Sequence, residues 1–84
     1  VFEQETLSVS TSTASVSFSQ EMDTVLIKNI GSTLCYVNFD AAATTNSWDL
    51  AAGDTLSIDT NVTAVHAITA SGTTTLRIIG QGKS

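Results

Sequence analysis

The chain has 84 residues, three of them basic, and a net charge of −5, and 42% of its residues are apolar. A chain of this length forms one domain with a thin core, because small domains bury only about 60% of the surface that their unfolded chains expose. The acidic balance argues against nucleic-acid and anionic-membrane partners, which require a basic surface.

The composition favours β-structure. Serine and threonine supply 25 residues, and proline is absent. Threonine and the β-branched aliphatic residues are enriched in strands. The single cysteine, Cys35, has no disulfide partner in the chain and lies in a strand-like alternation, so we expect a buried, inert thiol.

Apolar and polar residues alternate along the chain, with turn signals about every 8–12 residues, as in sandwiches and barrels. The first expected strand contains Leu7 and Val9, and the second contains Val16 and Phe18. Residues 20–23 are compatible with a single helical turn after the second strand. The remaining expected strands cover residues 24–30, 34–40, 54–59, 63–70 and 73–80.

Two short loops between these strands have the composition of hairpin turns. Gly31 follows the strand at 24–30 and supplies the permissive backbone of a tight loop. Ser71 and Gly72 precede the last strand and form a two-residue hairpin candidate. Both places therefore predict antiparallel pairing between consecutive strands.

These patterns predict an all-β fold. We expect a single small antiparallel β-sandwich over residues 1–80, jelly-roll-like or immunoglobulin-like, with about 7–8 short strands. The strand pattern is also compatible with a barrel. Residues 81–84 have nothing to bury and are expected to form a flexible tail.

Several apolar residues occupy positions that alternation assigns to the solvent side of a strand. An antiparallel sheet with one solvated face carries polar residues there, and an apolar patch of this kind invites association. We therefore predict a partner-contact surface, with Trp48 as a further contact residue in the loop between two strands. The predicted contact residues are Leu26, Ile30, Leu34, Tyr36, Trp48 and Ile79.

Trp48 has two interpretations. Its amphipathic ring suits a plug at the end of a sandwich or an anchor in an interface. Alternatively, Trp48 and Tyr36 could form a platform on which a sugar stacks. We favour the plug or the interface, because the chain has few aromatic residues.

The sequence predicts no catalytic, cofactor-binding or metal-binding residues. The single histidine, His66, lies between alanines without a recognisable nucleophile or orienting acid nearby in the sequence. Four aspartates are candidates for a calcium site, but turn chemistry explains three of them, Asp40, Asp54 and Asp59, better, and their spacing matches no calcium-binding loop. The four aspartates are Asp40, Asp49, Asp54 and Asp59. We therefore expect a protein that is not an enzyme.

From Val25 to Gly80 the sequence resembles a loose group of small bacteriophage-encoded β proteins. The matching segments are VLIKNIGSTLCYVNFD, DLAAGDTLSID and VTAVHAITASGTTTLRIIG. The resemblance implies a structural virion protein that decorates or cements a phage capsid, located in the virion. Its partners would be the major capsid protein or further copies of itself in a homo-oligomer. The alternative is a carbohydrate- or receptor-binding module of a phage fibre or tail.

Overall fold

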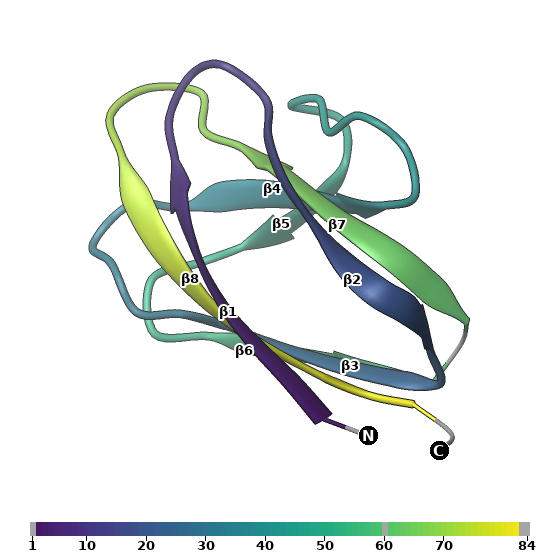
Figure 1. Ribbon diagram of the computed structural model, residues 1–84. Helices are drawn as coiled ribbons and strands as arrows, with labels where there is room; N and C mark the ends of the chain where they lie inside the picture. The colour runs from purple at the N-terminus through teal and green to yellow at the C-terminus, as the bar shows by residue number, and fades with distance from the viewer. Residues whose placement is uncertain (1, 60, 83–84) are drawn as a thin grey trace.

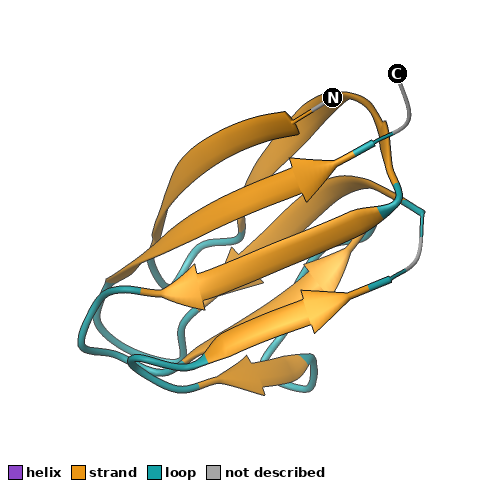
Figure 2. Cartoon of the chain, turned by 90° about the horizontal axis from the view of Figure 1, so that it is seen from below, coloured by secondary structure: helices purple, strands orange, loops and turns teal. Residues whose placement is uncertain are grey.

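The computed structural model describes residues 2–59 and 61–82. Every regular element in this part of the chain is a β-strand (Figure 2), which confirms the expected all-β class. It contains no helix that is long and apolar enough to cross a membrane. The strands are β1 (Phe2–Val9), β2 (Ala14–Met22), β3 (Thr24–Asn29), β4 (Cys35–Phe39), β5 (Trp48–Leu50), β6 (Thr55–Ile58), β7 (Val62–Ile68) and β8 (Thr74–Gln81).

The strands form two antiparallel sheets that face each other (Figure 1). The first, which we call sheet A, has the order β1-β8-β3-β6, and the second, sheet B, has the order β2-β7-β4-β5. Consecutive strands lie in opposite sheets, except for β4 and β5, which pair with each other. Eight strands arranged in this way form a jelly roll. The predicted β-sandwich is thus confirmed, in its jelly-roll form.

Both predicted hairpins are wrong. The strands that flank Gly31, β3 and β4, lie in different sheets, as do β7 and β8. Glycine-containing turns suit a corner between sheets as well as a hairpin, because local turn chemistry does not choose the pairing partner. Gly31 is required for close approach instead, since a Cβ atom there would lie 2.0 Å from Oγ1 of Thr74.

Most strand boundaries differ from the predicted ones by one or two residues, and in three places a segment has a different structure from the one predicted. β5 lies inside the segment expected to be a loop, and it is short because only Leu50 is buried. β2 continues through Met22, so residues 20–23 form no helical turn. β8 continues to Gln81, inside the segment expected to be a tail, while Lys83 and Ser84 lie outside the described residues.

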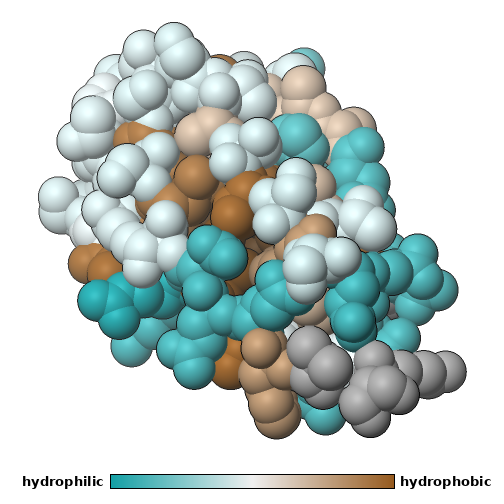
Figure 3. Space-filling view, viewed as in Figure 1, coloured by the Kyte–Doolittle hydropathy of each residue, from teal (hydrophilic) through white to brown (hydrophobic). Residues whose placement is uncertain are grey.

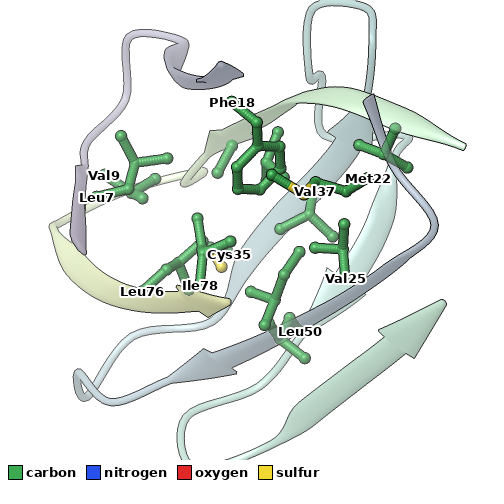
Figure 4. Packing of buried hydrophobic residues seen from close by; sticks show 14 residues of the cluster. Leu7, Val9, Phe18, Met22, Val25, Cys35, Val37, Leu50, Leu76 and Ile78 are labelled. Carbon is green, nitrogen blue, oxygen red and sulfur yellow. The ribbon is translucent and has the colours of Figure 1, made fainter. Parts of the chain in front are cut away.

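The inner faces of the two sheets form one apolar core (Figure 4). Valine, leucine, isoleucine and methionine side chains fill the space between the sheets, and the partly buried Phe39, Leu56 and Ile58 pack against them. Cys35 is fully buried there, and desolvation raises the pKa of its thiol to about 11. The expectation that the thiol is buried is thus confirmed.

Asn29 is a polar residue at one end of this core, and it is fully buried. Its Nδ2 donates to the carbonyl oxygens of Thr33 at 2.8 Å and of Leu50 at 3.0 Å. Its Oδ1 accepts from Thr74 Oγ1 at 2.6 Å and from the Gly31 amide at 3.2 Å. One side chain therefore ties β3 to segments of both sheets.

The edge strands β1 and β2 are joined across the sandwich. Glu3 of β1 accepts hydrogen bonds from the Ser19 amide of β2 at 3.1 Å and from the Ser19 hydroxyl. These bonds lower the pKa of Glu3 from its ordinary value of 4.5. Figure 3 shows that the face of the molecule seen in Figure 1 is mainly pale and teal, with apolar atoms gathered near its centre and further apolar atoms along its edges.

Candidate functional site

The outer face of sheet A carries two adjoining hollows, which we call together the outer groove. The larger hollow has a volume of about 540 Å³ and is bordered by residues of β1, β3 and β8. The smaller has a volume of about 220 Å³. Leu26 and Ile79 border both hollows, so they form the apolar centre of the groove.

The register of sheet A brings these apolar residues together. Leu26 of β3 lies directly opposite Ile79 of β8. Their sequence neighbours Ile27 and Ile78 are buried in the core, so alternation directs Leu26 and Ile79 to the outside. Phe2 of β1 borders the smaller hollow. Leu26 is 40% exposed and Phe2 is 64% exposed.

Basic side chains border the larger hollow beside this apolar centre. Lys28 of β3 lies directly opposite Arg77 of β8, two residues along each strand from Leu26 and Ile79. Thr6 of β1 continues the same row on the far side of Arg77, and Thr55 of β6 continues it beside Lys28. The outer groove therefore has an apolar part and a basic part.

The six predicted contact residues do not share one face. Leu26 and Ile79 lie in the outer groove, and Ile30 follows the end of β3 at the edge of the same sheet, where its amide donates to Thr75. Tyr36 belongs to sheet B, where it lies opposite Ile68 of β7 and points away from the core. The exposed Leu34 lies just before β4, outside the outer groove.

Trp48 does not plug the end of the sandwich, because it is 63% exposed on the short edge strand β5. It lies opposite Val37, whose side chain is buried, whereas its neighbour Asp49 lies opposite Tyr36. Alternation therefore places Trp48 and Tyr36 on opposite sides of sheet B. The two rings form no common platform for a sugar.

Two of the four aspartates considered for calcium, Asp40 and Asp59, have separate structural partners. Asp40 accepts hydrogen bonds from the Thr63 amide at 2.9 Å, the Thr63 hydroxyl at 2.7 Å and the Ala64 amide at 2.8 Å. These bonds, with those of Thr63 the largest contribution, lower the pKa of Asp40 from its ordinary value of 3.8. Asp59 accepts from the Thr24 hydroxyl. Within residues 2–59 and 61–82, no three His, Cys, Asp or Glu side chains are grouped so that they could hold a metal ion.

His66 lies on the outer face of sheet B. The register places it between Ser15 of β2 and Asn38 of β4. Asn38 instead hydrogen-bonds to Ala42 and to its neighbour Phe39, and among the described residues no hydrogen bond joins His66 to Ser15. The row therefore lacks the nucleophile–base contact that covalent catalysis requires.

Sequence reasoning found Leu26 and Ile79 but missed Phe2, Lys28 and Arg77. Phe2 lies on the same face of β1 as the outward residues Gln4 and Thr6. The inward positions of Leu7 and Val9 already indicated in the sequence that Phe2 would point outward. Lys28 and Arg77 carry no signal in the sequence, because their proximity depends on the pairing of β3 with β8.

No protein-family model matches this sequence, and no curated protein matches it. Among solved structures, the chain is similar to a cupin-superfamily protein from Desulfitobacterium hafniense, with a TM-score of 0.59 and 20% identity. That similarity covers 98% of this chain and 68% of the other. The chain is also similar to an HTH_3-family transcriptional regulator from Vibrio cholerae, with a TM-score of 0.64 and 12% identity. This second similarity covers 99% of this chain and 44% of the regulator's length.

These comparisons show a shared jelly-roll fold and correct the predicted relationship. The similar structures are a cupin-superfamily protein and a transcriptional regulator, not phage virion proteins. The prediction of a capsid decoration protein, with its alternative of a phage fibre or tail module, is therefore wrong. The sequence segments that suggested it are strands and turns of the kind that many jelly rolls contain.

Proposed function

We propose that this chain is a non-enzymatic binding domain that takes a small ligand in the outer groove of sheet A. The observation that carries the proposal is the adjacency of Leu26, Ile79 and Phe2 around one hollow on a solvent-facing sheet surface. Folding does not explain apolar residues at these positions, because the core lies on the other side of the sheet. A ligand that covered them would remove apolar surface from water and so gain binding free energy.

The location of the groove follows from the packing of the interior. The core side chains project into the space between the sheets (Figure 4), and the buried side-chain nitrogen and oxygen atoms of the described residues all have hydrogen-bond partners. The larger outer hollow, at about 540 Å³, falls within the range of roughly 300–1,000 Å³ that is typical of small-molecule sites. The exterior of sheet A is therefore the better place for a ligand.

The chemical groups near the groove support binding rather than catalysis. Its border contains amide, hydroxyl, aliphatic and basic side chains, together with the carboxylate-bearing residue Glu5. The thiol of Cys35 is buried in the core, and His66 projects from the other sheet. The groups that usually act as nucleophile and base are thus separated from the groove and from one another.

Nuclear magnetic resonance titration tests the proposal. A set of small ligands that differ in charge and apolar size should shift the backbone amide signals of Leu26 and Ile79. Ile79→Ser should weaken the shifts. Ile68→Ser is the matched control, because Ile68 is also a half-buried isoleucine that points outward, but from sheet B. If shifts cluster on sheet B, or if both variants weaken binding equally, the outer groove is not the binding site.

Self-association is a second candidate function, and the exposure of Trp48 favours it. Edge strands such as β5 present unpaired backbone groups, and an exposed tryptophan beside them suits an interface between copies of the chain. Light scattering over a range of concentrations measures the mass of the particle. A monomeric mass for the wild-type chain at high concentration would exclude this candidate, and Trp48→Ser should lower the mass if it holds.

A further inference from the structure

Lys28 and Arg77 form an unusual pair on the outer face of sheet A. They lie directly opposite each other on neighbouring antiparallel strands and are the only lysine and arginine in the described part of the chain. Directly opposed like charges on one face of a sheet destabilise the pairing. Folding therefore gives no reason for this placement.

No acidic side chain of the described residues neutralises this pair. The chain has a net charge of −5, so carboxylates are abundant, yet within the described residues none forms an ion pair with Lys28 or Arg77. Glu5 borders the same hollow, but it is two residues from Leu7 in β1. It therefore lies on the same face of the strand as Leu7, whose side chain points into the core. The basic pair is an electropositive spot on an otherwise acidic molecule.

The spot lies at one end of an apolar track. Successive outward residues on a strand are roughly 6.7 Å apart, since each residue advances the chain by about 3.3–3.4 Å. The row of Leu26 and Ile79 is thus one step from the basic pair, and Phe2, which pairs with Gln81, lies one further step along. The track extends roughly 13 Å from the basic pair.

We propose that the outer groove binds a small amphipathic anion, with its headgroup on Lys28 and Arg77 and its apolar body along Leu26, Ile79 and Phe2. This inference rests on the proposed function and specifies the class of ligand. An anion relieves the repulsion between the two cations, and the apolar body covers the exposed track. A neutral apolar molecule would leave the repulsion in place, and a cation would increase it.

The headgroup is a carboxylate or a phosphate. The planar guanidinium of Arg77 donates two parallel hydrogen bonds to either group, while the ammonium of Lys28 adds a compact positive charge. The hydroxyls of Thr6 and Thr55 flank the pair in the same row and supply further donors. The acidic surface of the chain disfavours binding to an anionic lipid bilayer, so the ligand is a free molecule rather than a membrane surface.

Calorimetric titration of the 84-residue chain with octanoate, octyl phosphate, octanol, octylamine and inorganic phosphate tests this inference. The two octyl anions should bind at least about tenfold more tightly than octanol, because hydrogen bonds to charged groups contribute more than neutral contacts. The ratio of octanoate to octyl phosphate affinity identifies the headgroup. Arg77→Gln should lower the affinity for both anions about tenfold. Lys83→Gln is the control, because it changes the net charge equally.

The outcomes separate this inference from the proposed function. If octanol binds as tightly as the octyl anions and shifts the amides of Leu26 and Ile79, the groove binds ligands but the anion inference is wrong. If Lys83→Gln weakens binding as much as Arg77→Gln does, only the net charge matters and the inference is also wrong. If none of the octyl compounds binds and no other ligand shifts these amides, both proposals are overturned.

Discussion

The two faces of sheet A carry different kinds of residue pairs, although they belong to the same strands. On the inner side, Ile27 lies opposite Ile78, and both side chains are buried. On the outer side, Lys28, which follows Ile27, lies opposite Arg77, which precedes Ile78. Both of these side chains are exposed. The inner pair stabilises the fold, whereas the outer pair places like charges together in water.

This difference separates residues that serve stability from residues that, in our proposal, serve binding. Each inner side chain has an explanation in packing or hydrogen bonding, since the buried polar atoms of the described residues all have partners. The outer side combines exposed apolar residues with an opposed basic pair, an arrangement that like-charge repulsion disfavours and that the proposed ligand would explain. Binding surfaces commonly have this cost in natural proteins.

Truncation on the inner side should have the largest effect. Ile27→Ala removes a fully buried side chain and leaves a cavity, so we expect the free energy of unfolding to fall by about 2–5 kcal/mol. Leu26→Ala, on the outer side of the same strand, should change it by less than about 1 kcal/mol. Urea denaturation measures both. Equal losses in the two variants would remove the distinction between the two sides.

The next largest effect is expected at Asn29. Asn29→Ala leaves the carbonyl groups of Thr33 and Leu50 and the hydroxyl of Thr74 without this partner in the interior. Unsatisfied buried polar groups cost about 1–3 kcal/mol, so the free energy of unfolding should fall by that amount. Asn38→Ala is the control, because Asn38 makes its contact to Ala42 at an exposed place. A loss at Asn29 no greater than that at Asn38 would contradict the importance of its burial.

A smaller change of opposite sign is expected on the outer side. Arg77→Glu converts the opposed cations into an attractive pair with Lys28, which should raise the free energy of unfolding by about 0.2–1 kcal/mol. The same substitution should abolish binding of octanoate. Thermal unfolding at low salt, where surface charges are least screened, measures the gain. A loss of stability would show that Arg77 already has a favourable structural role.

The smallest effect should appear in the dependence of stability on pH. The pKa of Glu3 is lowered by folding, so its contribution is present above the ordinary value of 4.5 and is lost as the pH falls through the folded pKa. Glu3→Gln should therefore be less stable than wild type at neutral pH, and the two should converge in acid. Urea midpoints at several pH values measure the difference. A constant difference at all pH values would show that the charge of Glu3 is not involved.

Much of the fold could be predicted from the sequence, because alternation is a local property. The inward residues Val25 and Ile27 and the outward residue Leu26 follow from the period of two residues along a strand. The pairing of strands could not be predicted in this way. Gly31 and Gly72 lie in connections between strands, as predicted, but a glycine in a connection does not show whether the connection forms a hairpin or joins two sheets.

The candidate site was predictable only in part. Leu26 and Ile79 stand out in the sequence because they are apolar where alternation requires polar residues. Tyr36 has the same kind of signal, and Trp48 was predicted as a contact residue in a loop, yet sheet B directs them to opposite sides, and neither lies in the groove. An exposed apolar residue in a sequence thus shows that something is unusual, but it does not show which other residues join it.

The sequence by itself indicated a small all-β domain and, along most of its strands, which residues face the core, because these features depend on local alternation. The tertiary structure alone decided that β3 pairs with β8 and not with β4, and therefore that Lys28 meets Arg77 beside Leu26 and Ile79. Strand pairing is set by the packing of the two complete sheets against each other, and that is a property of the whole chain.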